Sequence, residues 1–108
     1  MRHLTIHGHF YQPPREDPFT GEIPPEYGAQ PYRNWNERIT AECYRPLAEL
    51  GLFEQISFNL GPTLASWMEQ HAPDVYNAML DADRLNVARY GVGNAIALPY
   101  NHVIMPLA

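Results

Sequence analysis

The sequence predicts an α/β fold built from parallel β-α-β units. Two short runs, residues 4–10 and 55–60, alternate apolar and polar side chains with the period of two that is typical of strands. Segments with apolar residues at helical spacing follow each run, and an apolar segment over residues 95–107 offers a third strand. Strands that alternate with helices favour parallel pairing, because the helix carries the chain back across the sheet.

Composition bounds the class of protein. The chain has 108 residues, of which 45% are hydrophobic and 12% aromatic, so it suits one small globular domain and argues against disorder. Twelve acidic against seven basic residues give a net charge of −5 without a basic cluster, so we expect no nucleic-acid partner. No apolar run approaches the roughly 18 residues of a membrane span, and Arg2 and His3 interrupt any signal peptide. Because Cys43 is the only cysteine, a reducing, cytoplasmic location is expected.

The first strand, residues 4–10, should present His7 and His9 on one face, since side chains two apart in a strand point the same way. Gly8 leaves the other face bare and permits close packing there. Residues 13–34 follow as a long irregular loop rich in proline, glycine and charge. Loops of this length in a compact domain are more often functional than idle.

A helix should begin at a cap supplied by Asn34 or Asn36, with Glu37 in its first turn, and run to about residue 50. Pro46 predicts a kink or a break within it, and Gly51 is a natural stop. Its expected buried stripe follows helical spacing: Ile39, Cys43, Leu47 and Leu50.

The second strand, residues 55–60, leads directly into a helix that Pro62 opens at its first position. That helix should run to about His71 and bury Trp67 among its apolar side chains. Pro73 opens a further helix that can extend to Tyr90.

Polar residues stand near the expected carboxyl end of each strand. These are His7 and His9 on the first, Asn59 on the second, and Asn101 with His102 on or after the third. Ligands of parallel α/β folds bind at that edge, so we expect these side chains to converge on one site.

Residues 7–13 read His-Gly-His-Phe-Tyr-Gln-Pro. This motif resembles the first signature region of family-57 glycoside hydrolases, a superfamily that also has a less-studied branch, although Phe10 and Tyr11 intervene before Gln12 where the commoner pattern runs on directly. Residues 93–97 and 100–107, ending Asn-His-Val-Ile-Met-Pro-Leu, resemble the second. Residues 35–44 and 56–64 look like the less-studied branch.

The resemblance implies a (β/α)7 barrel, an incomplete relative of the TIM barrel, acting on α-glucans or related α-linked saccharides by hydrolysis or transfer. Its retaining mechanism uses a Glu nucleophile and an Asp acid/base about 5–5.5 Å apart. Both belong to later signature regions, so residues 1–108 are expected to form an N-terminal fragment of the barrel domain. We therefore expect no catalytic residue in this chain, no cofactor and no activity from the fragment alone.

On this resemblance the site residues bind substrate. His9 would hydrogen-bond a sugar hydroxyl, because imidazole can donate or accept. His7 would support it, and Gln12 and His102 would line the same pocket. Trp35 could stack on a sugar ring or only anchor the helix start.

Charged side chains have structural alternatives. Glu37 can stabilise the helix start, pair with Arg38 or reach into the cleft. Glu42 should pair with Arg38 or Arg45 at helical spacing.

Two other functions stay open. A three-imidazole zinc site of His7, His9 and His102 would fit a metal-dependent polysaccharide deacetylase, although no Asp lies suitably near and the resembling family works without metal. A non-catalytic carbohydrate-binding module is the other. A barrel stopped after about three strands would also leave an open edge, so we expect the fragment to self-associate.

Overall fold

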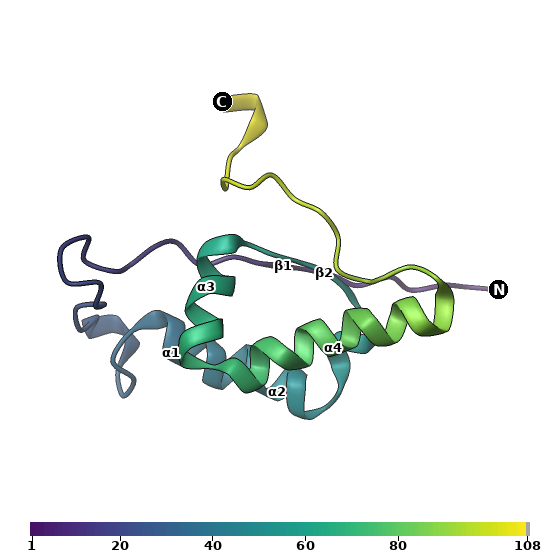
Figure 1. Ribbon diagram of the computed structural model, residues 1–108, viewed down its shortest axis with the longest axis horizontal. Coiled ribbons are helices and arrows are strands. Elements are labelled where there is room, and N and C mark those ends of the chain that lie inside the picture. The colour runs from purple at the N-terminus through teal and green to yellow at the C-terminus, as the bar shows by residue number, and fades with distance from the viewer. Residues whose placement is uncertain (108) are drawn as a thin grey trace.

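The computed structural model describes residues 1–107 and has an α/β architecture with helices on one face of a small sheet (Figure 1). Two parallel strands, β1 (His7–Phe10) and β2 (Ser57–Leu60), form the sheet. The main helices are α1 (Trp35–Ile39), α2 (Arg45–Glu49), α3 (Pro62–His71) and α4 (Pro73–Tyr90). Short turns of other helical types complete the list: η1 (Tyr27–Ala29), η2 (Thr40–Tyr44), η3 (Leu52–Glu54) and η4 (Met105–Leu107). The predicted α/β class with parallel strands is confirmed.

The third strand predicted over residues 95–107 is reduced to one bridge. Ala95 pairs in parallel with Phe58, held by backbone bonds from Phe58 N–H to Asn94 O and from Ile96 N–H to Phe58 O. The chain then leaves the sheet and rises on the side away from the helices (Figure 1). The first strand is also shorter than predicted, since Leu4 and Ile6 are exposed ahead of it.

The sheet has one apolar and one polar face. The register pairs His7 with Ser57, Gly8 with Phe58 and His9 with Asn59. Phe58 lies in the core under the helices, and the alternation of strand side chains then turns His7, His9 and Asn59 to the opposite face.

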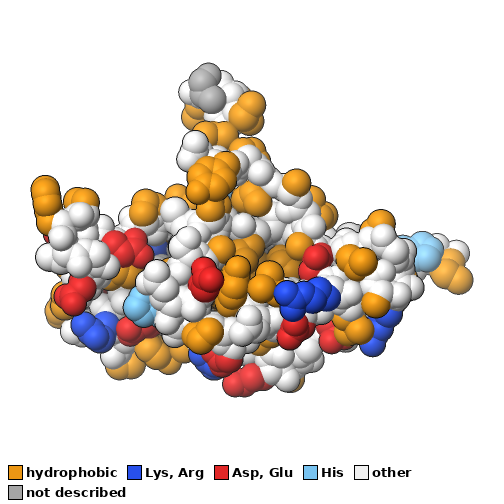
Figure 2. All heavy atoms as spheres, viewed as in Figure 1, with side chains coloured by type: hydrophobic (Ala, Val, Ile, Leu, Met, Phe, Trp, Pro, Cys, Tyr) orange, Lys and Arg blue, Asp and Glu red, His pale blue; other side chains and the backbone are white. Residues whose placement is uncertain are grey.

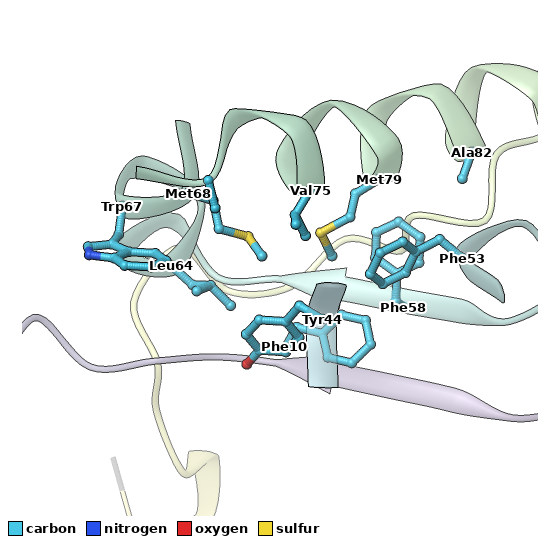
Figure 3. Packing of buried hydrophobic residues seen from close by; sticks show 11 residues of the cluster. Phe10, Tyr44, Phe53, Phe58, Leu64, Trp67, Met68, Val75, Met79 and Ala82 are labelled. Carbon is cyan, nitrogen blue, oxygen red and sulfur yellow. The ribbon is translucent and has the colours of Figure 1, made fainter. Parts of the chain in front are cut away.

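The core is an aromatic and aliphatic cluster between the sheet and the helices (Figure 3). The Phe10 ring lies 5.4 Å from that of Tyr44 and 5.9 Å from those of Phe53 and Phe58. α3 and α4 close the cluster with Leu64, Trp67, Met68, Val75 and Met79. The expectation that Trp67 is a core residue is confirmed.

The helix that begins after the long loop starts as predicted. Asn34 is its cap, and the side-chain oxygen accepts the Glu37 N–H at 2.9 Å. The Glu37 carboxylate in turn accepts the Arg33 N–H at 3.1 Å, as expected if Glu37 stabilises the start of the helix. Glu42 pairs with Arg38 at 3.3 Å, which leaves Arg45 to pair with Asp74.

Pro46 neither breaks nor ends this helix. The chain stays helical from α1 to α2 through the π-helical turn η2, in which Arg45 N–H bonds to Thr40 O, five residues back. Proline lacks the N–H that would bond Glu42 O, and its ring crowds that carbonyl. A wider turn just before Pro46 accommodates both effects.

The predicted buried stripe of this helix was partly wrong. Ile39 and Leu47 pack against the core, but Cys43 and Leu50 are exposed. The buried positions are instead Asn36, Thr40 and Tyr44. The extra residue of the π turn rotates the side chains that follow it about the helix axis. Arg15 donates to Asn36 and Gln12 donates to Tyr44, so two of the three inward-facing side chains have hydrogen-bond partners outside the helix.

Within residues 1–107, the structure has no helix that is both long enough and apolar enough to cross a bilayer.

We predict that Gly8→Ala destabilises the protein by about 1–3 kcal/mol. A Cβ at Gly8 would lie 2.5 Å from the end of the Phe10 ring, which the surrounding aromatic rings prevent from moving. Urea unfolding measures the change, with Thr5→Ala, at an exposed position next to β1, as the control. Equal stability of Gly8→Ala and the wild type would contradict this packing.

We predict concentration-dependent self-association. In the described residues the outer edge of β1 is unpaired, and apolar side chains are exposed near the termini, including Leu4, Ile6, Ile104 and Leu107. Figure 2 shows such atoms along the projecting C-terminal segment. Light scattering across a concentration series tests this, and a constant monomer mass throughout would refute it.

Candidate functional site

The polar face of the sheet holds paired side chains across β1 and β2. His7 Nδ1 lies 2.8 Å from Ser57 Oγ, and His9 Nδ1 donates to Asn59 Oδ1 at 2.5 Å. With Nδ1 of His9 protonated, its Nε2 is left as an acceptor for another group. The cross-strand register of the parallel pair thus fixes both the position and the tautomer of His9.

His102 joins this face from the C-terminal segment. Its ring stacks on Tyr11 with centroids 3.8 Å apart, and lies 5.5 Å from the ring of His9. The structure therefore brings together His9, Asn59 and His102 from the three successive segments named in the sequence. His7 lies on the same face of the sheet, two residues before His9 in β1.

A hollow of about 480 Å³ opens beside His102 at the carboxyl ends of the strands. His102 lines it, whereas His9 and Asn59 lie behind His102 and do not. Tyr11 and His102 form one side, and Pro62, Thr63 and Ser66 at the start of α3 form another. Hydroxyl, amide and imidazole groups beside aromatic rings suit a ligand that both donates and accepts hydrogen bonds. We refer to this as the strand-end hollow.

Gln12 lies inside the protein next to this hollow. Its Nε2 donates to Tyr44 Oη at 3.0 Å, and its Oε1 accepts from Arg15 at 2.9 Å. Its backbone oxygen accepts the Thr63 hydroxyl at 2.5 Å. Arg15 continues to Asn36 Oδ1 at 2.7 Å. Both polar ends of the Gln12 side chain are thus engaged by the protein, in a position that holds the turn after β1.

This Gln12 network, composed of Gln12, Arg15, Asn36 and Tyr44, was missed in the sequence. The sequence contained one indication of this network, because Asn36 and Tyr44 lie eight residues apart on one face of the predicted helix. Nothing local linked them to Arg15 in the loop, and an apolar stripe was the stronger pattern.

The contacts of Trp35 are those expected of a residue that anchors the start of the helix. Its ring lies under the Arg38 guanidinium, 5.2 Å from centroid to Cζ, and packs so closely on Gly28 that a Cβ there would lie 3.1 Å away. Its backbone N–H donates to Glu26. It does not line the strand-end hollow, and stacking on a sugar stays a prediction.

Within the described residues, no three His, Cys, Asp or Glu side chains are placed to hold a metal ion. His7, His9 and His102 are therefore not arranged as a three-imidazole centre.

Comparison with known proteins yielded no match to a family model, to a curated protein or to a solved structure.

We predict that Tyr44→Phe destabilises the protein at neutral pH by about 1–3 kcal/mol, because the Gln12 amide would lose its acceptor in a buried place. Guanidinium unfolding measures this, with the exposed Tyr27→Phe as the control. A loss no larger than that of the control would contradict the proposed importance of the network.

The pH dependence of stability offers a further prediction. Burial raises the pKa of Tyr44 above its ordinary 10.0, although the hydrogen bond from Gln12 opposes the shift. A raised pKa in the folded state means that the stability contribution is complete below about pH 10 and is lost as pH rises through the folded-state pKa. Unfolding between pH 8 and 11 should therefore show a steeper loss in the wild type than in Tyr44→Phe. Parallel curves would disprove the assignment.

Proposed function

We propose that this chain supplies the saccharide-binding edge of a barrel glycoside hydrolase or transferase that acts on α-glucans or related α-linked sugars with retention. The observation that carries the proposal is the convergence of His9, Asn59 and His102 beside the hollow at the carboxyl ends of parallel strands. The motif resemblance supplies the reaction class.

The two faces of the sheet support the barrel part of the proposal. Parallel sheets are normally covered on both faces. Here the helices cover the apolar face, and the opposite face carries His7, His9 and Asn59 (Figure 1). In a barrel with helices outside, that polar face points inward. The bridge at Ala95 extends the sheet from β2 by a further parallel segment, as barrel closure requires.

The chemistry of these side chains suits binding. His9 offers its Nε2 to a sugar hydroxyl while Asn59 holds the other ring nitrogen. The resemblance places the nucleophilic Glu and the acid/base Asp in later signature regions, so we assign His9 and His102 to holding the substrate. His7, hydrogen-bonded to Ser57, supports the same wall.

The surroundings of the proposed site need neither a cofactor nor a metal, since hydrogen bonds alone hold a neutral sugar. We propose a cytoplasmic location on the single cysteine, Cys43. The deacetylase alternative requires a metal-ligand group that residues 1–107 do not assemble. The carbohydrate-binding module differs from the proposed enzyme only in lacking turnover.

We predict that His9→Ala or Asn59→Ala weakens maltotriose binding at the strand-end hollow by about tenfold, the effect of losing one or two hydrogen bonds. The ring signals of His102 in NMR titrations report on this place, and His3→Ala is the control. Unchanged midpoints in both variants would refute the assignment. Stoichiometric zinc retained through dialysis would equally overturn it in favour of a metal site.

A further inference from the structure

A second polar recess lies away from the strand ends, against the helices. Two hollows of about 210 and 200 Å³ share the side chains of Glu37, Trp67 and His71, and we call their union the helix-side recess. It lies at the C-terminal end of α3, whereas the strand-end hollow lies at its N-terminal end. The nine steps from Pro62 to His71 correspond to about 13 Å of helix.

Carboxylates supply most of the acceptors in the recess. Glu16, Glu22 and Glu37 line one hollow together with a single guanidinium, that of Arg33. One oxygen of Glu37 accepts the Arg33 backbone N–H, which leaves its other oxygen for a ligand. Arg45 lines the second hollow, but its guanidinium is paired with Asp74. The remaining excess of negative charge in a small recess disfavours an anionic ligand.

Trp67 restricts the ligand from the other side. Its ring is buried among the core side chains, and Figure 3 shows the indole nitrogen on the side away from them. An indole N–H can only donate. The His71 ring packs against the indole, with the two ring centroids 5.3 Å apart. Trp67 therefore calls for a hydrogen-bond acceptor on the ligand.

A buried hydroxyl in the same recess lacks a partner. Thr40 is 4% exposed and lines the second hollow, and its Oγ1 makes no hydrogen bond to any described residue. An unpaired buried hydroxyl is costly. Thr40 also begins the π turn η2, a feature that is frequent at functional sites. Tyr32 and His71 add groups that donate or accept beside it.

We propose that the helix-side recess binds one ring of a neutral saccharide. The carboxylates require ligand donors, whereas Trp67 and Arg33 require ligand acceptors, so neither a simple anion nor a simple cation suits both kinds of group. A hydroxyl group donates and accepts without charge, and a sugar ring presents several hydroxyls at once. This inference stands on the recess alone and does not depend on the function proposed for the strand-end hollow.

The test follows the indole N–H signal of Trp67 in ¹⁵N-labelled protein. The chain has two tryptophans, so Trp35→Phe assigns the signals. Maltotriose, cellotriose and chitotriose are titrated separately, with spermidine and inorganic phosphate as charged probes. We expect at least one oligosaccharide, and neither charged probe, to move the Trp67 signal to saturation.

Variants separate this recess from the strand-end hollow. Tyr32→Phe combined with His71→Ala should raise the titration midpoint about tenfold, while His9→Ala should leave it unchanged. The same spectra show whether each variant is folded. The proposal is overturned if no oligosaccharide moves the Trp67 signal, if spermidine or phosphate moves it to saturation, or if the midpoint is unchanged in the folded double variant. A midpoint raised by His9→Ala would also overturn it, because the two places would then be one site.

Discussion

The packing of Phe10 over Gly8 is the constraint on which the rest of the structure depends. Because Gly8 has no side chain, the Phe10 ring lies back against β1 and meets Tyr44, Phe53 and Phe58 from three other segments. This contact ties the strand to the helices. It also sets the face on which every second residue of β1 must lie. His7 and His9 therefore lie on the face of the sheet opposite the helices.

The turn after β1 is fixed by polar contacts. Gln12 bonds to Tyr44 and Arg15, and its backbone oxygen bonds to Thr63 at the start of α3. Arg15 then reaches Asn36. A buried polar network of this kind stabilises the fold only when each of its members has its hydrogen-bond partners. It joins the long loop, the first helix and α3, and it sets the wall from which Tyr11 faces His102.

α3 separates two places with different chemistry. At its first turn the strand-end hollow offers imidazole, hydroxyl and aromatic groups. At its last turn the helix-side recess is lined by carboxylates and by the Trp67 side chain. Glu16 in the long loop lines both. Because the long loop is irregular and extended, this one segment contributes to two recesses at opposite ends of α3.

The sequence alone determined what local rules control. Alternation predicted two strands and put His7 and His9 on one face. Capping rules predicted Asn34 or Asn36 as the cap with Glu37 in the first turn, and Pro62 marked the start of α3. Tertiary structure decided what depends on distant partners. Tyr44, at the end of the π turn before Pro46, is buried and accepts a hydrogen bond from Gln12, which lies 32 residues earlier in the chain. Periodicity cannot predict such a pairing, because it indicates which way a side chain points and not which distant residue that side chain contacts.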